Sequence, residues 1–389
     1  MANKPKKVAI IGLDCAMPHM VEKLIAEGYL PTLKKLIDGG AYALNCLPPF
    51  PTITPPNWAS IGTGACAGTH QVTDFWIPIK GKTPITANTV ASYNSANVKA
   101  EFVWEAADKA GKKCIVFNYP GAWPSRMKNG IVIAGAGLGP GEHRDGYSGN
   151  DHDVSLCANQ LITTGLYPGA VRGEFQPAEG WANLKEPGEE PLQFAANLRF
   201  PEAAEPVAPT TWWVLARQSG DDGYDTITLS PTKDMKDAFF TLHVGDWSPK
   251  VTTRIKLADG SEREVFFKGK LLELSSDAEE FRLYLTGLMD LSRWVSTPEV
   301  LPQLAASQAV PVPEIAIIDY SLGNIDLDTM TECAEMHTEW LADAAVNLLS
   351  QNDWDLFAMH SHPIDWAYHA ILNEMDPQFN SDEAKRAAA

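Results

Sequence analysis

The chain has 389 residues, of which 45% are hydrophobic, so it can bury a sizeable core, and this argues against disorder as its default state. Its formal net charge of -18 argues against a general nucleic-acid-binding protein, because such a protein needs a basic surface. No apolar run approaches the roughly 20 residues of a membrane span, and the run that follows the basic N-terminus is too short for a signal peptide.

The six cysteines are scattered along the chain, and none has the close spacing of a zinc knot. In a chain of this length, buried free thiols are favoured over disulfides. Together with the absence of an apolar span from the sequence, this favours a cytoplasmic protein with no membrane partner. The sequence does not indicate an oligomeric state.

Residues 8–13 form a continuous apolar run rich in β-branched side chains, which predicts a buried, parallel and central strand. Asp14 follows directly, at the edge of the sheet where α/β proteins place their ligands. The run is not followed by the glycine pattern of a dinucleotide site. A carboxylate in this place either binds a metal ion or caps the next helix.

Strand and helix patterns alternate as far as about residue 160, which predicts an α/β sheet with helices on both faces. Thr54 precedes Pro55 and Pro56, which fit the first turn of a helix, so Thr54 is predicted to be the N-cap of a helix that runs to Gly64. The other expected elements are two short helices between residues 18 and 38, a strand at 41–47, a helix at 101–110, and strands at 113–118 and 131–134.

The pattern changes after about residue 160, and residues 161–312 are predicted to be an inserted β-rich subdomain between two parts of an α/β core, 1–160 and 313–389. Asp259-Gly260 lies between two extended runs and predicts a hairpin. The pair Trp212-Trp213 either stacks on a base or sugar or anchors the core of a small domain. Extended runs lie at 226–229, 251–257, 264–274 and 281–285.

A long amphipathic helix is expected at 329–350, followed by a strand at 356–359. Asp365 and His369 are four residues apart, which places a carboxylate and an imidazole on one helix face. They are either ligands of one Zn²⁺ or similar ion, or an ion pair or buried hydrogen bond.

His360 and His362 occupy alternate positions after the expected strand, so both face the same side, either toward a site or into the core. We expect them to support the metal ligands rather than to bind the metal.

The hydroxyl of Thr54, at a helix N-terminus, would face unpaired backbone donors that favour an incoming phosphate. A threonine alkoxide is costly at neutral pH, so a nucleophilic Thr54 needs a metal ion or a base beside it. Asn57 could donate its amide to a phosphoryl oxygen. The alternatives are that Thr54 only caps the helix and that Asn57 is a turn residue.

Taken in order, these segments resemble the alkaline phosphatase superfamily, and within it the type I phosphodiesterase/nucleotide pyrophosphatase branch and its predicted phosphohydrolase/phosphomutase group. The resemblance covers most of the chain and implies an α/β fold with a mostly parallel sheet flanked by helices and an inserted β-rich subdomain. Its matching residues are 8–14, 54–58, 63–64, 68–70, 244–248, 271–274, 353–357 and Asp365-x-x-x-His369.

The resemblance implies two divalent metal ions, zinc or alternatively manganese, and a small phosphorylated substrate. Asp14 and Thr54 would belong to one metal ion, and Asp365 and His369 to the other. Thr54 would attack phosphorus and form a phosphothreonine intermediate. Asn57, together with the Thr54 amide, would hold a non-bridging oxygen.

The family pattern continues with Asp-His-Gly and a further metal histidine, and neither follows His369 before Ala389. We therefore expect the sequence to be part of a longer enzyme; the alternative is an incomplete relative that binds metal weakly. The leading hypothesis is a metal-dependent phosphoester hydrolase, either a phosphodiesterase or a phosphatase. The alternatives are a phosphomutase of the same superfamily and a non-catalytic binding protein. A sulfatase is disfavoured, because neither Cys-x-Pro-x-Arg nor Ser-x-Pro-x-Arg occurs.

Overall fold

The computed structural model describes residues 7–43, 46–85, 88–134, 155–157, 159–184, 190–200, 207–218, 223–293, 295–312, 315–375 and 381. The chain divides into two compact units. Unit 1 comprises Met1–Ala136, Asp145–Gly149 and Asn352–Ala389, and unit 2 comprises Gly137–Arg144 and Asn150–Gln351. The domain boundaries expected at residues 160 and 312 remain predictions.

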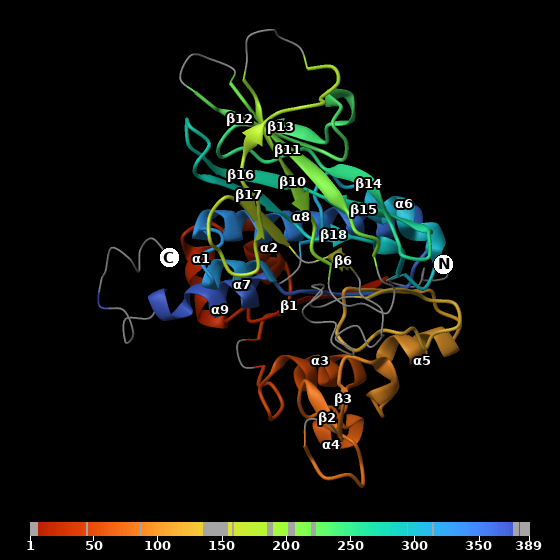
Figure 1. Cartoon of the computed structure of the whole chain (residues 1–389). Coiled ribbons are helices and arrows are strands. Elements are labelled where there is room, and N and C mark those ends of the chain that lie inside the picture. The colour runs from red at the N-terminus through yellow and green to blue at the C-terminus, as the bar shows by residue number, and fades with distance from the viewer. Residues whose placement is uncertain are drawn as a thin grey trace. The chain divides into compact units, whose positions relative to one another are not determined.

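A four-stranded parallel sheet forms the framework of unit 1, and the α/β fold class expected from the sequence is confirmed. Residues from the two ends of the chain lie side by side in it, since the first strand pairs with the last over its whole length, from Val8–Leu356 to Leu13–Ser361. The strand order is β1 (Val8–Leu13), β19 (Leu356–Ser361), β4 (Cys114–Phe117) and β5 (Ile131–Ile133). Figure 1 labels β1 and the helices of this unit.

Strand β1 is parallel, as expected, but it lies at the edge of the described sheet, so the prediction of a buried, central strand is wrong. The side chains of Val8 and Ile11 are 52% and 64% exposed. An apolar run indicates that a strand can be buried on both faces, but it does not indicate where in the sheet that strand lies.

The helices expected in unit 1 are formed close to their predicted bounds. The strand expected at 41–47 is not, because the described residues 41–43 and 46–47 have no regular structure; residues 44–45 lie outside the described residues. Pro48 and Pro49 follow and cannot donate to a strand ladder. The helices are α1 (Pro18–Ala26), α2 (Pro31–Gly39), α3 (Thr54–Thr63), α4 (Ala67–His70), α5 (Val103–Lys109) and α9 (Pro363–Met375), and a small hairpin pairs β2 (Trp76–Pro78) with β3 (Thr89–Ala91).

Aromatic side chains hold α3 within the core of unit 1. The Trp58 side chain on α3 is buried, as are Phe102 and Trp104, whose rings stack with their centroids 4.5 Å apart. Gly62 faces these two rings, and a Cβ atom there would come within 2.8 Å of Phe102. The absence of a side chain at Gly62 therefore lets α3 pack closely, which fixes the helix that begins at Thr54.

Unit 2 is rich in antiparallel strands, as expected for the insertion, and its apolar side chains form a separate core. The hairpin predicted at Asp259-Gly260 is confirmed, since β14 and β15 pair from Val251–Phe267 to Lys256–Glu262. The five-stranded sheet has the order β13 (Phe240–Leu242), β12 (Thr226–Ser230), β11 (Thr211–Arg217), β10 (Leu192–Asn197), β9 (Gln176–Pro177).

Two four-stranded sheets, three α-helices and three short 3-10 helices complete the described part of unit 2. One expected run, residues 264–274, divides into two strands that belong to different sheets. The first sheet has the order β14 (Val251–Lys256), β15 (Glu262–Phe267), β18 (Leu288–Met289), β6 (Ser155–Cys157); the second has β16 (Gly269–Leu274), β17 (Phe281–Leu285), β7 (Gln160–Thr163), β8 (Val171–Arg172); the helices are α6 (Leu301–Ala305), α7 (Ile315–Ser321) and α8 (Leu327–Gln351).

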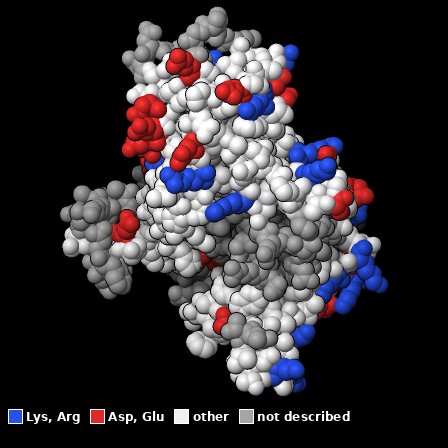
Figure 2. Space-filling view, viewed as in Figure 1, with Lys and Arg blue, Asp and Glu red and all other residues white. Residues whose placement is uncertain are grey.

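Two surface properties bear on partners. None of the helices in the part of the chain that the structure describes combines the length and apolar character needed to cross a membrane. On the face seen in Figure 2, lysine and arginine side chains lie interspersed with acidic ones, with uncharged areas between them.

Candidate metal centre

The carboxyl ends of β1 and β19 bring distant residues together at one edge of the sheet. Asp14 follows β1, and its backbone N–H donates to the Ser361 carbonyl at 2.9 Å. His360 lies on β19, where Asn118 donates its side-chain amide to the His360 carbonyl at 2.9 Å. The parallel pairing thus explains why residues 346 positions apart in sequence are in contact.

The Asp14 carboxylate is buried and is surrounded by nitrogen atoms. Its Oδ2 atom lies 3.2 Å from His360 Nε2 and 3.1 Å from His362 Nδ1, and it accepts from Trp58 Nε1 at 3.1 Å. Burial alone would raise the pKa of Asp14, but hydrogen bonds from His360 and His362 outweigh it and hold the pKa well below its usual range. Asp14 is therefore a carboxylate at neutral pH.

His360 is fully buried, and burial lowers the pKa of its imidazole. Its Nδ1 atom has no hydrogen-bond partner within the described part of the protein, so a second proton on the ring would gain no acceptor. The Trp58 ring packs edge-on against it, with centroids 4.6 Å apart. The neutral imidazole is thus the favoured form, and this is the form that binds metal ions.

His362 connects Asp14 to a second carboxylate, Asp365. One ring nitrogen, Nδ1, faces Asp14, and the other, Nε2, lies 3.0 Å from Asp365 Oδ2. Asp365 and His369 lie on one face of α9, as their spacing indicates, with His369 Nε2 3.4 Å from Asp365 Oδ2. Burial would raise the pKa of Asp365, but His362 and Cys15 outweigh it and lower that pKa. The two carboxylates and the histidines therefore form one connected group.

Cys15 also belongs to this group. Its thiol donates to Asp365 Oδ1 at 2.8 Å, and its backbone N–H donates to Asp14 Oδ1 at 3.0 Å. Burial, together with the negative charge of Asp365, raises the pKa of Cys15 to about 12. Without a bound cation the residue is thus a thiol.

Among the residues that the structure describes, two sets have ligand atoms close enough to hold a cation. They are Asp14 with His360 and His362, and Asp14 with Cys15 and Asp365. In the first set, the three ligand atoms lie 3.1 to 3.4 Å from one another. Tetrahedral ligands around zinc are separated by about 3.3 Å when each bond is about 2.0 Å, so two imidazoles and a carboxylate in this arrangement fit zinc.

The structure places Thr54 as the first residue of α3, with Ile53 as the N-cap, so the prediction that Thr54 is the N-cap is wrong by one residue. No side-chain hydrogen bond caps this helix. The residue that contacts Asp14 from α3 is Trp58, rather than Thr54 or Asn57. Because Trp58 lies four residues after Thr54, the two share one helix face, which directs Thr54 toward the same side of α3 as Asp14.

Two residues of this group were not identified as site residues from the sequence. Trp58 is buried in the core, and its indole N–H also reaches Asp14. Cys15 carried a signal, because it follows Asp14 directly, but a scattered cysteine more often is a buried free thiol.

Part of the chain that forms this site is similar to a known protein family. Residues 8–197 match the family model described as "Type I phosphodiesterase / nucleotide pyrophosphatase". The "Ectonucleotide pyrophosphatase/phosphodiesterase family member 1" of Homo sapiens is 33% identical over 97 residues, which are 24% of this chain and 10% of that protein. The chain thus matches only a tenth of that relative's length. No solved structure matches the chain significantly.

The matched segment includes Asp14, Thr54 and Asn57 but ends before β19 and α9. The contribution of His360, His362, Asp365 and His369 therefore rests on the geometry and not on the family match.

Proposed function

Because residues 8–197 match the type I phosphodiesterase/nucleotide pyrophosphatase family model, we propose that the chain is a member of this family and a metal-dependent phosphoester hydrolase with Thr54 as its nucleophile. The matched family implies phosphoester hydrolysis. The observation that carries the finer proposal is the convergence of Asp14, His360 and His362 at the carboxyl edge of the sheet, in contact with the helix that begins at Thr54.

Two divalent cations, zinc or alternatively manganese, would when bound supply the positive charge that lowers the pKa of a hydroxyl nucleophile and neutralises a leaving oxygen. Asp14, His360 and His362 would hold one of them, so the two histidines would be ligands and not the supporting residues expected from the sequence. Asp365 and His369 would hold the other, with Cys15 beside them. The buried carboxylate of Asp14 is already ionised, so cation binding at this residue requires no proton release.

Thr54 and Asn57 would act on the phosphoryl group. Pro55 and Pro56 lack N–H groups, and the Asn57 backbone N–H donates to the Ile53 carbonyl at 3.3 Å, so the first turn of α3 has few free donors. The Thr54 amide and the Asn57 side chain would therefore bind a non-bridging oxygen.

In the reaction, Thr54 Oγ1 would lose its proton and attack phosphorus in line. The new O–P bond would form as the bond to the leaving alcohol breaks, giving phosphothreonine and the alcohol, which takes up a proton. Water would then cleave the phosphothreonine to release phosphate, or a phosphomonoester from a diester, and restore the hydroxyl.

The first prediction concerns Thr54 directly. Thr54→Ala should lower kcat/KM for p-nitrophenyl phosphate or bis-p-nitrophenyl phosphate by about a thousandfold in the presence of zinc or manganese, because the attacking oxygen is removed. Thr338→Ala, an exposed threonine on α8, is the matched control and should retain full activity. Equal rates for Thr54→Ala and the unchanged protein would rule out the nucleophile assignment.

The two substrates separate a monoesterase from a diesterase, and the fate of the phosphate separates a hydrolase from a phosphomutase. A hydrolase releases phosphate to water, whereas a mutase returns it to the substrate.

We also propose a cytoplasmic location. The described cysteines Cys15, Cys46, Cys66, Cys114 and Cys333 are free thiols, which suits a reducing compartment. Fractionation of cells that express the protein would test this location.

A further inference from the structure

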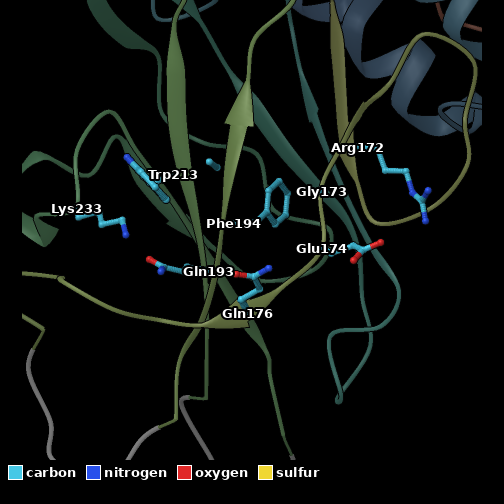
Figure 3. A pocket seen from close by; sticks show the side chains of 9 residues that line it. Arg172, Gly173, Glu174, Gln176, Gln193, Phe194, Trp213 and Lys233 are labelled. Carbon is cyan, nitrogen blue, oxygen red and sulfur yellow. The ribbon is translucent and has the colours of Figure 1, made fainter.

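We propose that unit 2 carries a second binding site, a groove that takes an acidic saccharide. The groove has a volume of about 630 Å³, which lies within the roughly 300–1,000 Å³ typical of small-ligand pockets. The residues that carry the argument are Arg172, Glu174, Gln176, Gln193, Trp213 and Lys233 (Figure 3).

Strand register explains how the groove forms on the five-stranded sheet. Trp213 lies directly opposite Ala195 on one neighbouring strand and opposite Ser230 on the other. A large aromatic side chain between two small residues leaves open space beside its ring. Trp212 points to the other face and is buried in the core of unit 2, so alternation along β11 gives the two tryptophans different roles.

Two amide side chains stand next to this space on the same face. Gln193 pairs across the strands with Gln176, and it lies two residues before Ala195. The Gln193 carboxamide is buried and oriented, because Trp181 Nε1 donates to its Oε1 at 2.7 Å and its Nε2 donates to the Pro177 carbonyl at 3.5 Å. An oriented amide beside an indole ring can bind the hydroxyl groups of a sugar while the ring contacts its C–H face.

The charges of the groove favour an anionic ligand. Lys233 Nζ lies 4.1 Å from the centre of the Trp213 ring and donates to the Glu179 carbonyl at 3.0 Å. Arg172 is anchored by a 3.0 Å hydrogen bond from Nε to the Thr164 carbonyl. Figure 3 shows Lys233 beside Trp213 and Arg172 with Glu174 on the other side of the groove.

Two cations therefore face a groove that has one acid, in a chain whose net charge is -18. A carboxylate on the sugar would bind these cations, and Glu174 would accept from sugar hydroxyls.

Ligand-observed nuclear magnetic resonance titration of the full chain tests this proposal with glucuronate, glucose and acetate as probes. Glucuronate contains no phosphorus, so its binding is independent of the proposed phosphoester chemistry. Because the site needs both the ring and the charge, the Kd for glucuronate should be about tenfold or more below those for glucose and acetate.

Lys233→Met should raise the Kd for glucuronate by about tenfold, and Trp213→Ala should abolish binding. Lys236→Met, an exposed lysine on the same loop that does not line the groove, is the matched control and should leave the Kd unchanged. Circular dichroism verifies that each variant is folded. Equal Kd values for glucuronate and glucose, or for Lys233→Met and Lys236→Met, would overturn the proposal.

Discussion

Trp58 belongs both to the core of unit 1 and to the candidate metal centre. Its ring packs edge-on against Tyr119 and His360, and its indole N–H donates to Asp14. Gly12 lies against this ring, and a Cβ atom there would come within 2.2 Å of Trp58. Strand β1 can therefore approach α3, and bring Asp14 to Trp58, only because residue 12 has no side chain.

Gly12→Ala should accordingly lower the free energy of unfolding by about 1–3 kcal/mol, because the new methyl group overlaps a buried ring that cannot move freely. Urea denaturation monitored by circular dichroism measures this change. Gly39→Ala, where a Cβ atom meets nothing within 4 Å, should have little effect. The same shift of midpoint in both variants would contradict the packing argument.

At the residue scale, the sequence indicated which residues belong to the site better than it indicated the contacts between them. Asp14 and His360 were identified because they lie where strands end, and the structure brings them to 3.2 Å. The partnership of His362 with both carboxylates could not be predicted, because it depends on the β1–β19 register. Trp58 was missed for a similar reason, since a core tryptophan and one that also donates to a carboxylate look alike in sequence.

At the scale of the element, α3 determines where Thr54 lies. The prolines predicted its first turn, but Ile53, an extended residue with φ of -123°, takes the N-cap position. At the other end, Gly64 adopts a left-handed conformation with φ of 67° and donates to the Ser60 carbonyl at 2.8 Å. The residue types indicate that a helix begins near Thr54, whereas the backbone hydrogen bonds determine which residue is the N-cap.

Gly64→Ala should destabilise unit 1 by about 1 kcal/mol, because a side chain disfavours the left-handed conformation that ends α3. Thermal or urea unfolding would show this loss. Gly68→Ala serves as the control, since Gly68 has no positive φ and a Cβ atom there meets nothing within 4 Å. An unchanged stability of Gly64→Ala would mean that this helix end does not require glycine.

Elements were predicted best where periodicity is strong, as in α8 and in the β14–β15 hairpin. Strands β8, β9 and β10 were missed within residues 166–210, because they are short or lie among prolines and glycines. The edge position of β1 was missed because an apolar run does not specify its neighbours.

At the scale of the whole molecule, stability should depend on pH through a polar cluster in unit 2. Asp319 accepts from Tyr284 Oη at 3.3 Å, from Asn159 at 3.3 Å and from Asn324 at 3.2 Å. Burial raises the pKa of Asp319 to about 6 in spite of these donors. In the unfolded chain the same carboxyl has the ordinary aspartate pKa of about 3.9.

Between these pH values the folded protein holds a proton that the unfolded chain has lost. The contribution of this proton to the free energy of unfolding is therefore complete below about pH 4 and is lost as the pH rises through about 6. It amounts to at most about 3 kcal/mol. Asp319→Asn, which resembles the protonated form, should remove this fall in stability, as measured by hydrogen exchange of β17 between pH 4.5 and 7.5. Asp328→Asn, at an exposed position, is the control. Parallel pH curves for Asp319→Asn and the unchanged protein would contradict the assignment.

The overall organisation could be predicted further than the site. Alternating patterns and ordered motifs indicated an α/β fold with a β-rich insertion, and the family match to residues 8–197 agrees with that resemblance. The groove around Trp213 could not be predicted, because its open space depends on which small residues lie opposite the tryptophan.

Zinc binding tests the central claim most directly. Equilibrium dialysis followed by metal analysis should show that the unchanged protein binds zinc, and that His360→Ala and His362→Ala each weaken binding at least about tenfold, because each removes a nitrogen close to Asp14. His243→Ala, an exposed histidine in unit 2, should bind zinc as the unchanged protein does. The same zinc affinity in His360→Ala, His362→Ala and the unchanged protein would contradict the account.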